Sequence, residues 1–364
     1  MKIKEITRYL EQLAPPGMQE SYDNSGLIYG DPNTEVTNAL ISLDCTEEII
    51  DEAIKRSCNL VIAHHPIVFK GLKKLNGKNY VERTVIKAIQ NDIAIYAIHT
   101  NLDNYHLGVN KKIGSLLNIS NPQILSPKRE ELVKLIVFCP KEQMEQVSSA
   151  LFEAGAGQIG DYSECSFLTE GIGTFKGGEN SNPQLGEAGQ KEEVSENKIE
   201  VVCQKVKLPQ ILSSMQKAHP YEEVAYDLIP LLNQDNSSGS GMFGELEEEI
   251  EAEKFLQFVK EKFNCGIIRH TAIHKKMIKK VAWCGGSGSF LLSAAKRKKA
   301  DIFITGDFKY HEFFDAEDQI IIADIGHFES EQFTIDLIAE FLRKKFPTFA
   351  PCLTGINTNP VNYF

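Results

Sequence analysis

The sequence predicts an α/β protein in which a two-lobed α/β domain carries a second, inserted α+β domain. Short continuous apolar runs alternate with helical stretches, and this alternation stops near residue 126 and resumes near residue 247. An apolar run of four to eight residues that ends at a breaker is typical of a strand buried on both faces of a parallel sheet. Strand–helix–strand repetition predicts parallel strands joined by right-handed crossovers.

The composition excludes several classes of protein. A chain of 364 residues with 42% hydrophobic and 24% charged residues is long enough for more than one domain. The net charge of −11 argues against a nucleic-acid partner, because binding to phosphates requires a basic face. The eight cysteines form no C-x-x-C pair, which indicates reduced thiols. No apolar stretch is long enough to span a membrane, so we expect a cytoplasmic protein without a membrane partner.

The first lobe, residues 1–125, begins with an amphipathic helix at 2–13 that ends at the Pro-Pro-Gly of 15–17. Predicted elements then alternate: strand 39–43, helix 46–57, strand 60–63, basic loop 70–78, helix 80–91 and strand 93–98. Polar side chains at the carboxyl ends of such strands lie where α/β proteins bind ligands.

His64 and His65 directly follow the strand at 60–63, and Pro66 ends its ladder. Neighbouring side chains on a strand point to opposite faces, so the two imidazoles suit one ion poorly. Where the strand breaks, each could hold a different ion. The alternative is that two polar residues fill a strand-to-loop turn.

His99 and Asp103 follow the next buried strand in the same way. Either residue alone is equally typical of a turn or a helix cap. Their position beside His64 and His65 favours a role in the same site.

The inserted domain, residues 126–246, repeats one strand–helix–strand order twice, which predicts a ferredoxin-like α+β fold. Its strands are expected at 132–139, 161–167, 199–204 and 224–230, and its helices at 141–155 and 209–218. Residues 176–197 are rich in Gly, Glu, Asn and Ser and predict a mobile loop. The stretch 219–223, His-Pro-Tyr-Glu-Glu, is either a ligand site or, more commonly, a helix stop.

The second lobe, residues 247–364, returns to α/β order. Its helices are expected at 247–264 and 290–299, and its strands at 265–272, 280–284, 301–304 and 319–323. A Gly-rich turn precedes the helix at 290 and could bind a phosphate through free backbone N–H groups. This turn comprises Gly285, Gly286, Ser287 and Gly288 and lacks the P-loop lysine, so a turn kept for packing is an equal alternative.

Metal-competent residues therefore leave the ends of four apolar strands: His64/His65, His99/Asp103, Asp307/His311 and His327/Glu331. If the strands are parallel neighbours, these groups converge on one edge of the sheet. His327 and Glu331 are four residues apart and share one face of a helix, although such a pair is also common on surfaces. Imidazoles and carboxylates suit borderline divalent ions, and one carboxylate can bridge two ions about 3.5–4 Å apart.

Six motifs along the whole chain resemble those of the Nif-three-like dinuclear-metal proteins, the GTP cyclohydrolase 1 type 2 homologues. They lie at residues 22–27, 63–66, 99–103, 284–288, 305–311 and 326–331. One departure is Tyr22, where many members carry Trp. The insert resembles that of the family's longer bacterial members, which is similar to PII and CutA signalling proteins. The resemblance implies a toroidal homohexamer and two divalent ions per chain, zinc first and manganese or iron as alternatives. The ligands it implies are His64, His65, Asp103, His327 and Glu331.

These observations predict a two-metal hydrolase acting on a nucleotide or another phosphate-containing small molecule, with His99 or His311 moving protons. GTP ring opening is implied by the family name alone, and a fold does not determine a function. The alternative is a non-catalytic regulatory or metal-handling hexamer whose insert senses a small molecule. A protein-interaction role is a third reading, for which no motif identifies a partner.

Overall fold

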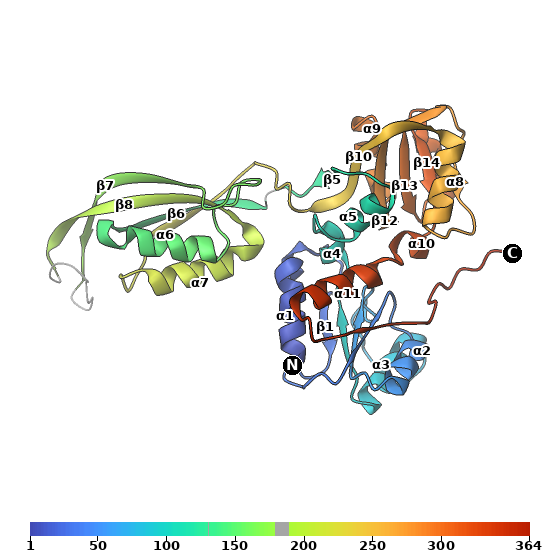
Figure 1. Cartoon of the computed structure of the whole chain (residues 1–364). Helices are drawn as coiled ribbons and strands as arrows, with labels where there is room; N and C mark the ends of the chain where they lie inside the picture. Colours follow the sequence, from blue (N-terminus) through green and yellow to red (C-terminus); the bar gives the residue numbers. More distant parts are fainter. Residues whose placement is uncertain (130, 179–188) are drawn as a thin grey trace. The chain divides into compact units, whose positions relative to one another are not determined.

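The computed structural model describes residues 1–129, 131–178 and 189–364 and divides the chain into two compact units (Figure 1). Unit 1 comprises Met1–Pro127 and Ser237–Phe364, and unit 2 comprises Lys128–Asn236. Several sheets with helices between them confirm the predicted mixed α/β class. Within the described ranges, no helix combines the length and apolar character needed to cross a bilayer.

The first sheet of unit 1 has the strand order β1-β4-β3-β2-β15. Strands β15, β2, β3 and β4 run parallel, and β1 pairs antiparallel at the edge. The strands are β1 Gly26–Tyr29, β2 Ala39–Ser42, β3 Leu60–Ala63, β4 Ala94–Ala97 and β15 Cys352–Leu353. All residues of β2, β3 and β4 are buried, as their continuous apolar sequences predict.

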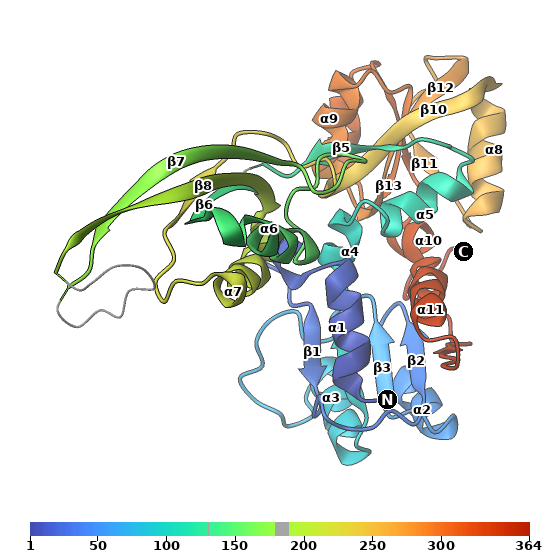
Figure 2. The same ribbon diagram turned by 60° about the vertical axis from the view of Figure 1, so that its left-hand side comes forward.

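Helices cover both faces of this sheet (Figure 2). Side chains of α2 and α3 pack against one set of strand residues, and those of α1 and α11 pack against the other set. The helices are α1 Ile3–Leu13, η1 Pro16–Met18, α2 Glu47–Lys55, α3 Tyr80–Gln90, α4 Thr100–Asn104, α5 Val109–Leu116 and α11 Thr334–Lys345. Thr46 and Asn79 cap α2 and α3 by accepting backbone N–H groups.

The second sheet of unit 1 has the order β11-β14-β13-β12-β10-β5. Strands β12, β13 and β14 are parallel, whereas β10 pairs antiparallel with both β12 and β5. The strands are β5 Gln123–Pro127, β10 Gly239–Glu251, β11 Arg269–His270, β12 Met277–Ser287, β13 Ile302–Gly306 and β14 Ile321–Asp324. The helices are α8 Ala252–Lys262, η4 Ser289–Leu291, α9 Leu292–Arg297, η5 Tyr310–Ala316 and α10 His327–Glu331.

Unit 2 is one antiparallel sheet, ordered β7-β8-β6-β9, with α6 and α7 packed on one face (Figure 1). The elements are β6 Leu132–Pro140, η2 Lys141–Gln143, α6 Met144–Glu153, β7 Ser166–Lys176, β8 Lys191–Gln204, η3 Lys205–Lys207, α7 Leu208–Ala218 and β9 Tyr226–Pro230. Its core joins strand residues such as Leu135 and Val201 to helix residues such as Leu151 and Met215.

Four expectations from the sequence are wrong. Of the expected strand 161–167, only Ser166 and Phe167 are strand, and that strand, β7, continues to Lys176. Residues 247–251 of the expected helix 247–264 are strand, because Ile250 and Glu251 pair with Ile278 and Met277 of β12. Of the expected strand 265–272, only Arg269 and His270 form a strand, which pairs with β14. The expected loop 176–197 is strand from Lys191 onward, and its residues 179–188 lie outside the described residues.

The expected boundaries at residues 125 and 246 fall inside β5 and β10, which pair with each other in unit 1. Pro127 and Gly239 are register partners in that pair, so the chain leaves and re-enters unit 1 at neighbouring positions. All eight cysteines are free thiols, and Cys165 and Cys352 are the two that are not buried.

Candidate metal centre

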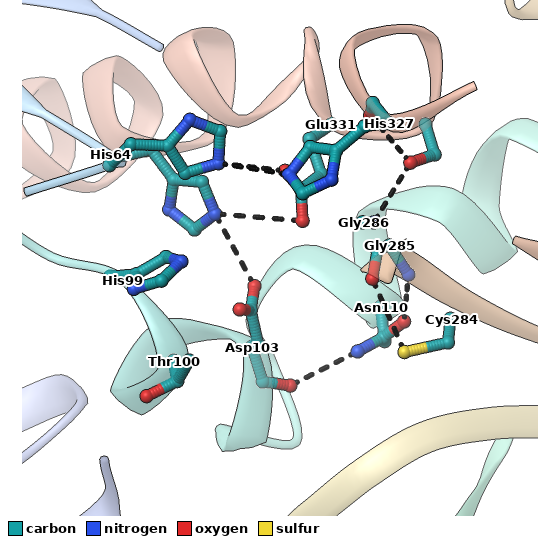
Figure 3. A network of polar contacts seen from close by, with 12 residues as sticks. His64, His99, Thr100, Asp103, Asn110, Cys284, Gly285, Gly286, His327 and Glu331 are labelled. Atoms are coloured by element: carbon teal, nitrogen blue, oxygen red, sulfur yellow. Dashed lines mark hydrogen bonds and ion pairs between the residues drawn. The ribbon is translucent and has the colours of Figure 1, made fainter. Parts of the chain in front are cut away.

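The predicted ligands lie together in unit 1, where the carboxyl ends of strands from both sheets meet (Figure 3). His64 and His65 follow β3, Asp103 lies on α4 after β4, and α10 after β14 carries His327 and Glu331. Gly326 has a φ of +95°, a left-handed value that glycine tolerates, and it lets α10 begin directly after β14.

His64 is buried, Asp103 is half-buried, and the buried atoms with which they face each other lack hydrogen-bond partners among the described residues. The side chain of His64 is 0% exposed, and its Nδ1 lies 2.7 Å from the carbonyl oxygen of Ile98. Since a carbonyl only accepts, Nδ1 carries the proton and Nε2 of the neutral ring holds a lone pair. That Nε2 lies 3.5 Å from Oδ1 of Asp103 and 3.8 Å from Oε1 of Glu331. Among the described residues, neither Nε2 of His64 nor Oδ1 of Asp103 has a hydrogen-bond partner.

His65 and His327 share the second oxygen of Glu331. Oε2 of Glu331 is 3.0 Å from Nε2 of His65 and 3.1 Å from Nε2 of His327. The two Nε2 atoms are 3.4 Å apart. Nδ1 of His65 pairs with Asp44 at 2.8 Å, and Nδ1 of His327 pairs with Asp307 at 2.7 Å.

All three imidazoles thus direct Nε2 to the centre and anchor Nδ1 on an oxygen, as metal-ligating histidines do. Ligand atoms of His64, His65 and Glu331 lie within 4.8 Å of one another and form a candidate metal triad.

The charges of the cluster are strongly coupled. Burial, and then the charge of Glu331, raise the pKa of Asp103 to about 8. Burial alone would lower the pKa of His65, but hydrogen bonds to Asp44 and Glu331 raise it to about 9. Burial opposes ionisation of Glu331, yet the charge of His327 holds its pKa well below the usual range. A divalent cation at this cluster would therefore compete with protons for the same nitrogen and oxygen atoms.

The unpartnered nitrogen of His64 and oxygen of Asp103 fit a divalent metal ion. A buried imidazole nitrogen and a buried carboxylate oxygen without partners cost free energy unless something satisfies them. A cation satisfies both, and nitrogen with carboxylate oxygen is the donor chemistry of Zn²⁺, Mn²⁺ and Fe²⁺ sites.

The two predicted proton carriers occupy different surroundings. The ring of His99 lies 5.3 Å from those of His64 and His65, measured between centroids, and its Nδ1 is 2.7 Å from Asp23. His311 is exposed on η5 and packs against Tyr310 and Phe314. In the described part of the chain, none of its contacts is with the predicted ligands, and its proton-transfer role stays a prediction.

The predicted phosphate-binding glycines pack against the metal centre. The N–H groups of Gly285 and Gly286 already donate to Asn110 and Ser330, at 3.0 and 2.9 Å. A Cβ atom on Gly286 would lie 2.4 Å from Oε1 of Glu331. Close approach to Glu331 therefore explains Gly286, as in the packing alternative. Phosphate binding by Ser287 and Gly288 stays a prediction.

Sequence reasoning missed two carboxylates. Asp44 anchors His65 and lies two residues after the end of β2, at the carboxyl end of a buried strand like His64. Asp23 anchors His99 and also accepts from the backbone N–H of Thr100. Asp23 lies in the polar turn at 22–27. Burial alone would raise the pKa of its carboxyl group, but hydrogen bonds with His99 and Thr100 outweigh burial and lower this pKa.

Comparisons with known proteins agree on one family. Residues 1–360 match the family described as Duf34/NIF3 (NGG1p interacting factor 3). A Bacillus subtilis relative, named GTP cyclohydrolase 1 type 2 homolog, is 40% identical over 327 residues, 89% of this chain and 88% of its own. A Staphylococcus epidermidis relative of the same name is 34% identical over the full length of both chains.

A solved Bacillus cereus structure, titled as a protein related to NIF3, matches with a TM-score of 0.86 and 36% identity. It covers 100% of this chain and 99% of that one. A Staphylococcus aureus structure matches over the same shares, with a TM-score of 0.78 and 30% identity.

Proposed function

Because the chain belongs to the Duf34/NIF3 family, we propose that it binds two divalent metal ions and hydrolyses a nucleotide or another phosphate-containing small molecule. The observation that carries this proposal is the unpartnered pair of buried atoms, Nε2 of His64 and Oδ1 of Asp103, beside Glu331. The name of the relatives makes GTP one substrate to test.

The positions of the Glu331 oxygens support two ions. Oε1 is the oxygen nearer His64, whereas Oε2 lies close to both His65 and His327. His64, Asp103 and one oxygen of Glu331 would hold the first ion, and His65, His327 and the other oxygen the second. Asp103 has a second oxygen and can serve as a further bridge. We propose zinc first, with manganese or iron as alternatives.

Bound divalent ions would supply Lewis-acid chemistry and lower the pKa of water to near neutrality. The chain's own residues fix the reacting geometry. Asp44 and Asp307 orient the rings of His65 and His327 through Nδ1. Asp23 orients His99, whose Nε2 remains able to accept a proton from water or donate one to a leaving group. His311 is the second proposed carrier.

Elemental analysis together with an activity screen tests this proposal. Wild-type protein should carry two divalent ions per chain, and His65→Ala and Glu331→Ala should carry fewer. Hydrolysis of GTP or of a member of a phosphate-ester panel should fall in parallel with metal content. Protein with two bound ions that leaves GTP and the whole panel intact would contradict the enzymatic proposal.

The separate unit 2 favours a second candidate function, a regulatory or metal-handling homohexamer. Two strand–helix–strand halves and the sheet order β7-β8-β6-β9 support a ferredoxin-like, PII/CutA-like unit that senses a small molecule. Replacing residues 128–236 by a short turn between Pro127 and Ser237 separates the candidates. Unchanged turnover would leave unit 2 a regulatory or assembly part, whereas metal loss in a protein without turnover would favour metal handling. Light scattering of the intact protein tests the hexamer.

A further inference from the structure

We propose that Lys70, Lys73 and Lys74 bind the phosphate-like group of an anionic ligand in a cavity beside the metal centre. The cavity has a volume of about 890 Å³ and is lined by these lysines and by His65 with its partner Asp44. The inference rests on the proposed function, because the cavity would place such a ligand next to the metal-binding imidazoles. It assigns phosphate recognition to this lysine segment and not to the glycine turn at residues 285–288.

The lysine segment that lines this cavity is positively charged, whereas the protein as a whole is negatively charged. Residues 70–78 contain four lysines and no acidic residue, in a chain with a net charge of −11. In the described ranges, Lys70, Lys73 and Lys74 form no ion pair. An anion entering the cavity therefore meets ammonium groups that no carboxylate neutralises.

The two carboxylates that line the cavity already have partners. Asp44 pairs with His65 and accepts from the hydroxyl of Thr358 at 2.6 Å. Glu82 accepts the N–H groups of Asn76 and Lys78 at 3.1 and 3.0 Å. Glu82 is also buried, so it fixes the end of the lysine segment against helix α3. The segment thus has a defined backbone at its end and free side-chain charges.

Apolar rings line the same cavity and suit the non-phosphate part of a ligand. Phe69 and Tyr80 are 43% and 61% exposed, although both belong to the cavity wall. The centroid of the Phe69 ring is 6.2 Å from that of His99, which links the wall to the proposed proton carrier. A phosphate ester with a planar or apolar group matches this combination of charge and rings.

The other cavity beside the metal centre has the wrong charge for an anion. It has a volume of about 500 Å³ and is lined by His327 and by four carboxylates: Asp44, which also lines the lysine cavity, Asp307, Asp324 and Glu329. Its one lining Arg or Lys side chain, Arg269, is already paired with Asp324. The glycine turn offers less still, because the N–H groups of Gly285 and Gly286 are occupied. The lysine cavity is therefore the better anion site of the two.

Binding of inorganic pyrophosphate by calorimetry tests the proposal, with both metal-loaded and metal-free full-length protein. The test variant is K70Q/K73Q/K74Q. The control variant, K55Q/K217Q/K344Q, removes the same charge from exposed lysines outside the cavity. We expect the test variant to bind at least about tenfold more weakly in both metal states, because it loses several charge-assisted contacts. The control variant should bind like wild type, and salt should weaken wild-type binding more than binding by the test variant.

A conservative variant distinguishes charge from structure. K70R/K73R/K74R keeps the positive charge and should restore most of the affinity, while metal content and thermal stability stay at wild-type values in all four proteins. Equal pyrophosphate affinity in wild type and K70Q/K73Q/K74Q would overturn the site. Lysine-dependent binding by a protein that hydrolyses no substrate would keep the site and remove the hydrolase. Hydrolysis whose KM does not change in K70Q/K73Q/K74Q would keep the hydrolase and remove the site.

Discussion

Two buried histidines, one in each unit, illustrate the difference between a ligand and a structural residue. His64 in unit 1 is 0% exposed, and its Nε2 has no hydrogen-bond partner among the described residues. His219 in unit 2 is 7% exposed, and both of its ring nitrogens are satisfied. Its Nε2 donates to the carbonyl of Phe138 at 2.9 Å, and its Nδ1 accepts from the N–H of Tyr221 at 3.1 Å.

The comparison shows that burial alone does not identify a functional histidine. Both residues follow a regular element: His64 follows β3, and His219 caps α7. They differ in whether the protein itself completes their hydrogen bonds. An incomplete buried ring points to an external partner, whereas a complete one stabilises the fold.

The largest effect should come from removing each histidine in turn. His64→Ala should weaken metal binding at least about a hundredfold, because a direct ligand contributes more than its supporting residues, whose loss costs about 10–100-fold. His219→Ala should leave metal content unchanged but lower the free energy of unfolding by about 1–3 kcal/mol, because the Phe138 carbonyl loses its donor. Competition titrations and urea unfolding measure the two effects. Metal loss in His219→Ala would break the comparison.

A smaller effect is expected from replacing Asp44. Asp44 is the hydrogen-bond partner of Nδ1 of His65, as the Phe138 carbonyl is the partner of Nε2 of His219. Asp44→Asn should weaken metal binding by about 10–100-fold, because the neutral amide holds and polarises the His65 ring less strongly. Asp51→Asn is the matched control, since Asp51 pairs with Lys87 on the nearby surface. Metal titration of the three proteins gives the result. Equal affinities would mean that the carboxylate charge does not support His65.

Gly286→Ala tests how tightly the metal centre is packed. Gly286 has a φ of +61°, and an added Cβ would meet Oε1 of Glu331, so the variant should lose about 1–2 kcal/mol of unfolding free energy and bind metal more weakly. The control is Gly171→Ala in unit 2, where an added Cβ meets open space. Chemical denaturation and metal titration compare them. A Gly286→Ala protein as stable and as metal-replete as the control would show that the site has room to adjust.

The smallest effect concerns pH and His219. Burial lowers the pKa of His219 below its ordinary value of 6.5, so the folded protein favours the neutral ring. The stability that the neutral His219 ring contributes is fully present above pH 6.5. It is lost as pH falls from 6.5 towards the pKa of His219 in the folded protein, by at most about 1.4 kcal/mol per pH unit. His219→Gln cannot titrate and should show a shallower loss between pH 6.5 and 5. The free energy of unfolding is measured by urea denaturation at several pH values. If it falls equally steeply with pH in wild type and in His219→Gln, a neutral buried His219 is excluded.

Much of the candidate site could be predicted because its residues stand at the ends of continuous apolar strands. His64, His65 and Asp103 can be recognised in the sequence because they follow continuous apolar strands. Asp44 and Asp23 could not be assigned to particular histidines, because the sequence gives no distance between a loop carboxylate and an imidazole on another element. The use of the Gly285 and Gly286 amides was equally hidden, since it depends on Asn110 and Ser330 from distant segments.

The errors in the fold arose where strand pairing overrides local propensity. The Glu-rich residues 247–249 favour a helix on their own. They extend β10 instead, because that strand continues along β12 as far as the pairing of Glu251 with Met277. The Glu, Ser and Asn content of residues 191–197 likewise indicated a loop, but each of these residues has a register partner on β7 or β6. Such partners lie far away in sequence and leave no local signal.

The pairing of Pro127 with Gly239 has a consequence for the order of folding. An unfolded segment between these two residues would make their pairing entropically costly, since loop-closure entropy rises with length. Once unit 2 has folded, its own contacts shorten the effective loop that β5 and β10 must close. Early folding of unit 2 would therefore accelerate completion of the second sheet, and with it the assembly of the metal centre.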